Sequence, residues 1–258
     1  MAHIYFDESI HDRGAFIVGA YVCGPDAQTA VTAAIRRVGL NPDTDEFKSS
    51  ARMDNNTQRA ALREELRQVL ASYRIGVLVV PRSERDALGE HALRGLDQIA
   101  CANSLLDRSG MVAAFDEGVF QSTKQAVDLS ASIGIDRYCT VLPEQDSRIV
   151  KGLQLADLVT HTAGTMLLDT LGLIKKSVSA GPNSGYDEDL QIDLGFELWA
   201  SVRYQFFHSG PVKDQAGEYG GALMDVGNNG FYISPSCETG LRKAAVERFG
   251  QCYLGCIH

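Results

Sequence analysis

The chain has 258 residues, of which 45% are hydrophobic and 22% are charged, and its formal net charge is −9 at pH 7. Because a chain of this length and apolar content can bury a large core, the composition excludes a disordered protein. The acidic balance argues against a broad basic surface for nucleic acid. It does not exclude a nuclease, since a carboxylate cluster attracts phosphate once divalent cations fill it.

No segment resembles a membrane span, which needs roughly 18–20 apolar residues; the longest apolar run, at 75–80, has the length of a strand. The N-terminus lacks the basic region, apolar stretch and small-residue cleavage site of a secretion signal. We therefore expect a cytoplasmic protein with no membrane segment. In that reducing compartment the six cysteines are expected to be thiols rather than disulfides.

Strand and helix patterns alternate through the first two thirds of the chain. The segments 2–9 and 14–24 are apolar and flank a turn with Asp12 and Gly14, which predicts an antiparallel hairpin. Further strands are predicted at 74–81, 111–118 and 137–144, and helices at 25–40, 55–73, 90–110, 123–134 and 147–172. Such alternation predicts an α/β fold in which helices cover a mixed sheet.

The pattern changes after Gly172. A loop at 179–189 precedes an aromatic-rich helix at 190–210, a hairpin at 222–235 that turns across 227–230, and a last helix at 237–250. No flexible linker interrupts this region. We therefore expect a core at 1–173 and a helical and hairpin C-terminal extension at 174–258 that packs on the core.

Four acids stand out by their positions. Asp7 and Asp116 end apolar strand patterns, Glu46 precedes Lys48 in a short segment, and Asp157 lies among apolar residues of the long helix. An acid in such surroundings is paired, capped or bound to a cation, because an isolated buried charge is costly. Clustered carboxylates at strand ends are therefore explained if a metal offsets their mutual repulsion.

Carboxylate oxygens are the ligands that Mg²⁺ and Mn²⁺ prefer, so the four acids could supply a site for two such ions. Two-metal sites of this kind catalyse the attack of water on phosphodiesters. Glu46 has rivals within its own segment, Asp43 and Asp45, which could take its place. The alternative for all four acids is that they are surface residues and helix caps.

The motifs that contain these acids resemble a known family. "YFDES" at the start of the chain, "EFKSS", "AFDEG" and "LQLADLV" are similar, in this order, to the motifs of the domain of unknown function 3800 family of bacteria and phages. The resemblance spans about residues 3–170 and implies a ribonuclease-H-like fold. It also implies that Asp7, Glu46, Asp116 and Asp157 form the acidic tetrad of the active site. Ile10 stands where the family has Gly.

The neighbours of the acids have two readings each. Lys48 could contact a scissile phosphate or form a salt bridge to Glu46, and His161, one helical turn from Asp157, could shuttle protons or be an ordinary polar residue at the helix edge. Because side chains alternate across a strand, Glu8 and Glu117 are expected to point away from Asp7 and Asp116.

Together these observations predict a metal-dependent nuclease whose substrate, DNA or RNA, is left open. Two alternatives remain: a non-catalytic module of the same fold that binds nucleic acid or protein, and a component of a phage-defence or toxin system. The helix predicted at 190–207 carries more apolar residues than one core-facing stripe uses, which favours a homodimer or a protein partner at the extension.

Overall fold

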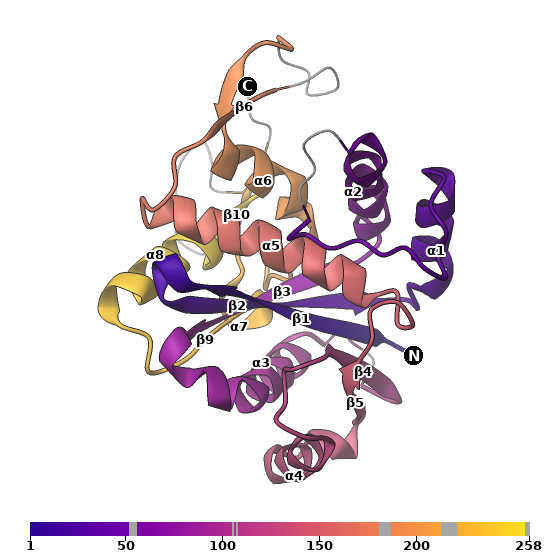
Figure 1. Cartoon of the computed structure of the whole chain (residues 1–258). Coiled ribbons are helices and arrows are strands. Elements are labelled where there is room, and N and C mark those ends of the chain that lie inside the picture. Colours follow the sequence, from indigo (N-terminus) through magenta and orange to yellow (C-terminus); the bar gives the residue numbers. More distant parts are fainter. Residues whose placement is uncertain (52–55, 105, 107, 181–186, 213–220, 256–258) are drawn as a thin grey trace.

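A mixed six-stranded sheet forms the centre of the computed structural model, which describes residues 1–51, 56–104, 106, 108–180, 187–212 and 221–255 (Figure 1). The strand order is β5-β4-β1-β2-β3-β9. Strand β2 is antiparallel to both of its neighbours, whereas the β1–β4, β4–β5 and β3–β9 pairs are parallel. The strands are β1 His3–His11, β2 Phe16–Gly24, β3 Arg74–Pro81, β4 Met111–Asp116, β5 Cys139–Gln145 and β9 Phe231–Ile233. The α/β sheet flanked by helices is as predicted.

The first two strands form the hairpin that the sequence predicts, with one 3-10 turn at Asp12–Gly14 between them. Their side chains alternate between the two faces of the sheet. In β1, Tyr5 joins one buried cluster, whereas Ile4 and Phe6 join the other. This alternation fixes the face on which each acid of β1 lies, because consecutive side chains of a strand point in opposite directions.

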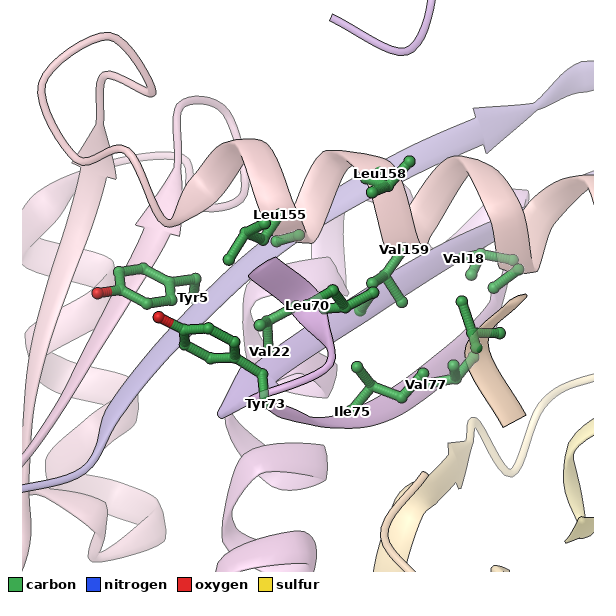
Figure 2. Packing of buried hydrophobic residues seen from close by; sticks show 14 of the residues in the cluster. Tyr5, Val18, Val22, Leu70, Tyr73, Ile75, Val77, Leu155, Leu158 and Val159 are labelled. Atoms are coloured by element: carbon green, nitrogen blue, oxygen red, sulfur yellow. The ribbon is translucent and has the colours of Figure 1, made fainter. Parts of the chain in front are cut away.

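Helices cover both faces of the sheet. On one face α5 lies across β1 and β2, with α1 and α2 beside it, and on the other face lie α3 and α4 (Figure 1). Figure 2 shows Leu155 and Val159 of α5 directed toward the strands, near Leu70 of α2. The helices are α1 Gln28–Arg37, α2 Thr57–Leu70, α3 Leu88–Ala102, α4 Thr123–Ile133 and α5 Leu153–Thr170.

Helices α1 to α5 are all shorter than predicted, and α3 and α5 show the physical reason. Helix α3 ends at Ala102, because the Asn103 side chain donates to the carbonyl of Ile99 (2.8 Å) and the chain then leaves the helical path. Helix α5 begins only at Leu153, because the residues before it form turns around Asp146, whose carboxylate accepts from the backbone N–H of Arg148 (2.7 Å). The second difference matters for the site, since these turns bring Ser147 to the acids.

The C-terminal extension differs most from the prediction. The helix predicted at 190–210 is a short strand, helix α6 and a 3-10 turn, and the hairpin predicted across 227–230 does not form, because these residues make one helical turn. Strand β9 pairs with β3 instead and extends the main sheet. The elements are β6 Ser177–Ser179, β7 Gln191–Asp193, α6 Leu194–Val202, the turn Arg203–Gln205, β8 Leu223–Asp225, α7 Gly227–Gly230, α8 Thr239–Phe249 and β10 Gln251–Tyr253.

Much of the apolar surface expected on the aromatic helix lies inside the protein's own core. Leu198, Val202, Phe206 and Phe207 are all buried. After α6 the chain runs beside β3, and the N–H of Phe207 donates to the carbonyl of Ile75 (3.0 Å). Because these four side chains are buried, little remains of the apolar excess from which the sequence predicts a partner surface.

No helix in the described ranges combines the length and apolarity that crossing a bilayer requires.

Candidate active site: carboxylates around Lys48

Asp7 and Asp116 come together where two parallel strands separate. The last residues of β1 and β4 that pair with each other are Phe6 and Phe115. The residue that follows in each strand is an aspartate. Successive side chains of each strand belong in turn to the two buried clusters on opposite faces of the sheet. By this alternation, both aspartates lie on the face that α5 covers. Strand β1 continues to His11, so Asp7 lies in the middle of its strand rather than at its end as predicted.

Asp7 is 8% exposed, and the pKa of its carboxyl group is raised to about 9. Burial is the largest cause, followed by repulsion from Asp157, Asp116 and Glu8, and the hydrogen bond from the Glu8 N–H (2.8 Å) opposes these effects only in part. The pKa of Asp116 is also raised, mainly by burial, although Lys48 and a hydrogen bond with Asp7 lower it. Without a cation, this pair therefore holds a proton at neutral pH.

Asp157 projects from α5 and is held by Ser49 from the segment before α2. The backbone N–H of Ser49 donates to Asp157 Oδ2 (2.8 Å), and the Ser49 hydroxyl donates to Asp157 Oδ1. Burial raises the pKa of Asp157, and the two hydrogen bonds from Ser49 oppose that shift. Of the three alternatives that the sequence left open for Asp157, paired, capped or bound to a cation, the structure shows hydrogen bonding to a residue of the "EFKSS" segment.

Glu46 and Lys48 lie at the rim of the cluster with Ser147. Glu46 Oε2 accepts from the Ser147 hydroxyl (2.6 Å) and lies 3.6 Å from Lys48 Nζ. Lys48 Nζ also contacts the Ser147 hydroxyl (3.1 Å). The salt bridge that the sequence offered as one reading of Lys48 is therefore present.

Lys48 is the positive charge that all four predicted acids share. Partial burial lowers the pKa of Lys48, but the combined attraction of Glu46, Asp116, Asp157 and Asp7 outweighs burial, so the net shift is upward. An ammonium group among several carboxylates offsets part of their repulsion in the absence of metal. The structure thus brings Asp7, Asp116 and Asp157 together, with Glu46 joined to them through Lys48.

Gln154 explains why the two outer segments meet at this place. It is fully buried at the start of α5, accepts from the N–H of Phe47 (2.9 Å) and donates to the carbonyl of Ser147 (2.9 Å). One side chain therefore ties the Glu46 segment to the turns before α5. Removing it would leave buried backbone groups without partners.

His161 lies one turn beyond Asp157 on α5, as the spacing predicts. Burial lowers its pKa, as does Arg63 of α2, whereas Asp157 raises it. Arg63 thus adds a positive charge close to His161, whereas His161 itself is favoured in its neutral form. The proton-shuttle role stays a prediction.

The two glutamates that follow the aspartates lie away from the cluster. Glu8 Oε1 pairs with Arg85 Nη1 (2.9 Å) on the α3 side of the sheet, and burial raises the pKa of Glu8 to about 7. Glu117 is exposed in the turn after β4. The prediction that strand alternation separates Glu8 from Asp7 is confirmed.

The donor set suits a hard divalent cation, since it consists of carboxylate oxygens whose mutual repulsion a cation would relieve. Within the described part of the chain, however, no three His, Cys, Asp or Glu side chains are arranged as a ready-made ligand set. The physical reason is visible at Asp157, both of whose oxygens face Ser49. A cation would have to draw the carboxylates closer together.

Sequence reasoning missed Ser49, Ser147 and Gln154 as functional residues. Ser49 and Gln154 lie within the motifs "EFKSS" and "LQLADLV", which was the available signal. No sequence motif indicated Ser147, because its hydroxyl reaches Glu46 only through the turn that precedes α5.

No protein-family model matches the chain, and no curated protein matches its sequence. The resemblance to the domain of unknown function 3800 family stays a prediction.

Proposed function

We propose that the protein is a metal-dependent phosphodiester hydrolase that cleaves nucleic acid. The observation that carries this proposal is the meeting of Asp7, Asp116 and Asp157 on one sheet face, where burial raises the pKa of all three and repulsion between the acids adds to the shift at Asp7 and Asp116. Perturbed carboxylates gathered at one place are characteristic of functional sites. A purely structural role would not require three acids to share a buried site.

Asp7, Asp116, Asp157 and Glu46 are the residues that would hold Mg²⁺ or Mn²⁺. When bound, such ions neutralise charge on phosphate oxygens and lower the pKa of water. The residues of this chain supply the remaining functions. Ser49 bonds both oxygens of Asp157, and the Ser147 hydroxyl bonds Oε2 of Glu46, so that the orientation of each carboxylate is fixed.

Lys48 and His161 would meet the substrate. Lys48 is 43% exposed at its side chain, so its ammonium group can turn from Glu46 to a phosphate. His161, whose pKa burial lowers, is neutral near pH 7 and can accept or donate a proton at its ring nitrogens. Arg63 beside it adds positive charge where the substrate's own charge would accumulate.

The sheet supports the same proposal. The order β3-β2-β1-β4-β5, in which only β2 runs against the others, is compatible with a ribonuclease-H-like core. On this reading β9 and α6–α8 are additions beyond the core. We further propose that the protein acts in the cytoplasm.

The test compares wild type with Asp7→Ala on single-stranded, duplex and hybrid DNA and RNA substrates. We expect slow cleavage with Mg²⁺ or Mn²⁺, none with Ca²⁺, whose larger and looser coordination shell orients water and phosphate poorly, and almost none in the variant. If neither protein cleaves any of the substrates with Mn²⁺ present, the enzyme proposal is wrong and the protein is a non-catalytic binding module.

The defence or toxin alternative requires a protein partner or a second copy at the C-terminal extension. The exposed Tyr204 and the half-buried Phe196 and Trp199 are what remains for such a surface. Light scattering of the purified protein, alone and with products of neighbouring genes, would detect either assembly. A monomer in every mixture would remove this alternative.

A further inference from the structure

The turn after Asp116 is held by charged side chains from two other elements. Strand β4 ends at Asp116, and the chain turns through Gly118, whose φ of 86° lies in the left-handed region. Both backbone polar groups of Gly118 bond to a side chain rather than to another backbone group. Because Asp116 immediately precedes this turn, the turn fixes the path of the backbone that leaves Asp116.

Arg85 holds one side of the turn. It lies in the 3-10 segment Arg82–Ala87, donates from Nη2 to the Gly118 carbonyl (2.8 Å), and pairs through Nη1 with Glu8 Oε1 (2.9 Å). Glu8 directly follows Asp7. One planar guanidinium therefore joins the residue after Asp7 to the turn after Asp116, on the sheet face opposite the carboxylates.

Glu144 of β5 holds the other side. Its Oε2 accepts from the N–H of Gly118 (3.0 Å), and its Oε1 accepts from the N–H of Phe120 (3.4 Å). Glu144 itself has a φ of 54°, a conformation that residues other than glycine rarely adopt. Such conformations cost on the order of 1–3 kcal/mol, and they persist where the surrounding structure requires them.

Glu8 adds a second unfavourable feature in the same place. Its side chain is only 9% exposed, and of its two oxygens Oε2 is buried with no hydrogen-bond partner among the described residues. A buried carboxylate that is only half paired destabilises the fold. An unusual backbone and a half-paired buried charge thus both accompany the contacts that lock the Asp116 turn.

We propose that Arg85 and Glu144 are positioning residues that set the Asp116 carboxylate against Asp7 for divalent-cation binding. The inference rests on the proposed function. It assigns the far face of the sheet a role in the site, through the turn rather than through contact with substrate or metal. Partners of this kind, which orient metal ligands without touching the metal, typically account for 10–100-fold in metal affinity.

The experiment measures Mn²⁺ binding by calorimetry, alongside the melting temperature of the metal-free protein. We expect Arg85→Gln to raise the Mn²⁺ Kd about 10–100-fold, because the neutral amide lacks the charge for Glu8 and the fork that also reaches Gly118. The Mn²⁺ Kd of Arg85→Lys should lie between those of wild type and Arg85→Gln, because lysine restores the positive charge but cannot reach Glu8 and Gly118 at the same time. Glu144→Ala, which removes both acceptors, should also weaken binding.

Arg242→Gln is the matched control. Arg242 likewise donates to backbone carbonyls, those of Ser234 (2.7 Å) and Pro235 (3.0 Å), but remote from the carboxylates in the chain and on a different turn. We expect it to lower the melting temperature while leaving the Mn²⁺ Kd unchanged. A comparable loss of affinity in this variant would overturn the proposal, because it would show that general destabilisation suffices.

Two further outcomes separate the inference from the proposed function. If wild type binds Mn²⁺ and both Arg85→Gln and Glu144→Ala bind it equally well, the positioning role is wrong and the metal site stands. If wild type binds no Mn²⁺, both proposals fail. If Arg85→Gln does not fold, the Mn²⁺ Kd values of Arg85→Lys and Glu144→Ala are compared with that of wild type instead.

Discussion

Ser49 occupies both oxygens of the Asp157 carboxylate, one through its backbone N–H and one through its hydroxyl, although 108 positions separate the two residues in the chain. The contact anchors the segment that carries Glu46 and Lys48 to helix α5. It also fixes the orientation of the Asp157 carboxylate and supplies hydrogen bonds to both of its oxygens. Ser49 is therefore the first residue to test.

We expect Ser49→Ala to lower the free energy of unfolding by about 1–3 kcal/mol, because a buried carboxylate loses a donor. The Mn²⁺ Kd should rise as well, since Asp157 loses its orientation. Chemical denaturation and calorimetry measure the two effects. Ser49→Thr keeps the hydroxyl and serves as the control; if it fails as badly as Ser49→Ala, side-chain size rather than the hydrogen bond decides.

Asp7→Asn should stabilise the metal-free protein at neutral and alkaline pH. The folded-state pKa of Asp7, about 9, lies above the ordinary value of 3.8, so the folded state binds more protons than the unfolded state between these pH values. Its contribution to stability is thus present below pH 3.8 and is lost as pH rises towards 9. Asparagine carries no charge and escapes this loss, which we expect to be at least on the order of 1 kcal/mol at pH 8.

Denaturant unfolding at pH 5, 7 and 8.5, in EDTA and in Mg²⁺, measures this effect. Mg²⁺ should stabilise wild type but not Asp7→Asn, because only wild type retains the ligand. Equal stabilisation of both proteins by Mg²⁺ would place the metal elsewhere.

His11 should make the protein sensitive to mild acid. Burial lowers its pKa to about 4, with a smaller effect from His161, and within the described residues its Nε2 is buried without a hydrogen-bond partner. Because the folded-state pKa lies below the usual value of 6.5, the contribution of His11 to stability is present above pH 6.5 and is lost as pH falls through about 4.

We expect His11→Phe, which keeps a ring against Phe16, to reduce this dependence. Melting temperatures between pH 4.5 and 7.5 test the prediction. Parallel curves for the two proteins across that range would show that another group titrates.

Phe206→Ala should show whether the extension stabilises the core. Phe206 is 4% exposed and its ring lies 6.4 Å from that of Phe249 in α8. Truncating a buried phenylalanine costs about 3–5 kcal/mol, and we expect one cooperative transition that shifts as a whole. Val127→Ala, at an exposed position of α4, is the control and should change stability by less than about 0.5 kcal/mol. Two separate transitions in Phe206→Ala would instead mean that the extension unfolds independently.

The C-terminal extension shows where sequence reasoning failed. A local pattern predicted one aromatic helix through Phe206 and Phe207, but the helix ends at Val202 and these two side chains enter the core beside β3. The glycine- and asparagine-rich segment 227–230 predicted a hairpin, yet its second strand pairs in parallel with β3. Local propensity is a weak prior, and tertiary packing overrides it where a sheet edge is available.

The sequence by itself determined the alternation of strands and helices, the hairpin of β1 and β2, and the candidate acids, because hydrophobic periodicity and buried charge are local signals. Strand alternation also predicted that Glu8 lies on the other face from Asp7. Only the tertiary structure decided which groups hold those acids: Ser49 on Asp157, Ser147 on Glu46, and Arg85 and Glu144 on the turn after Asp116. These contacts join residues that are far apart in the chain, and no local pattern records them, since they form only when packing brings separate elements to one place.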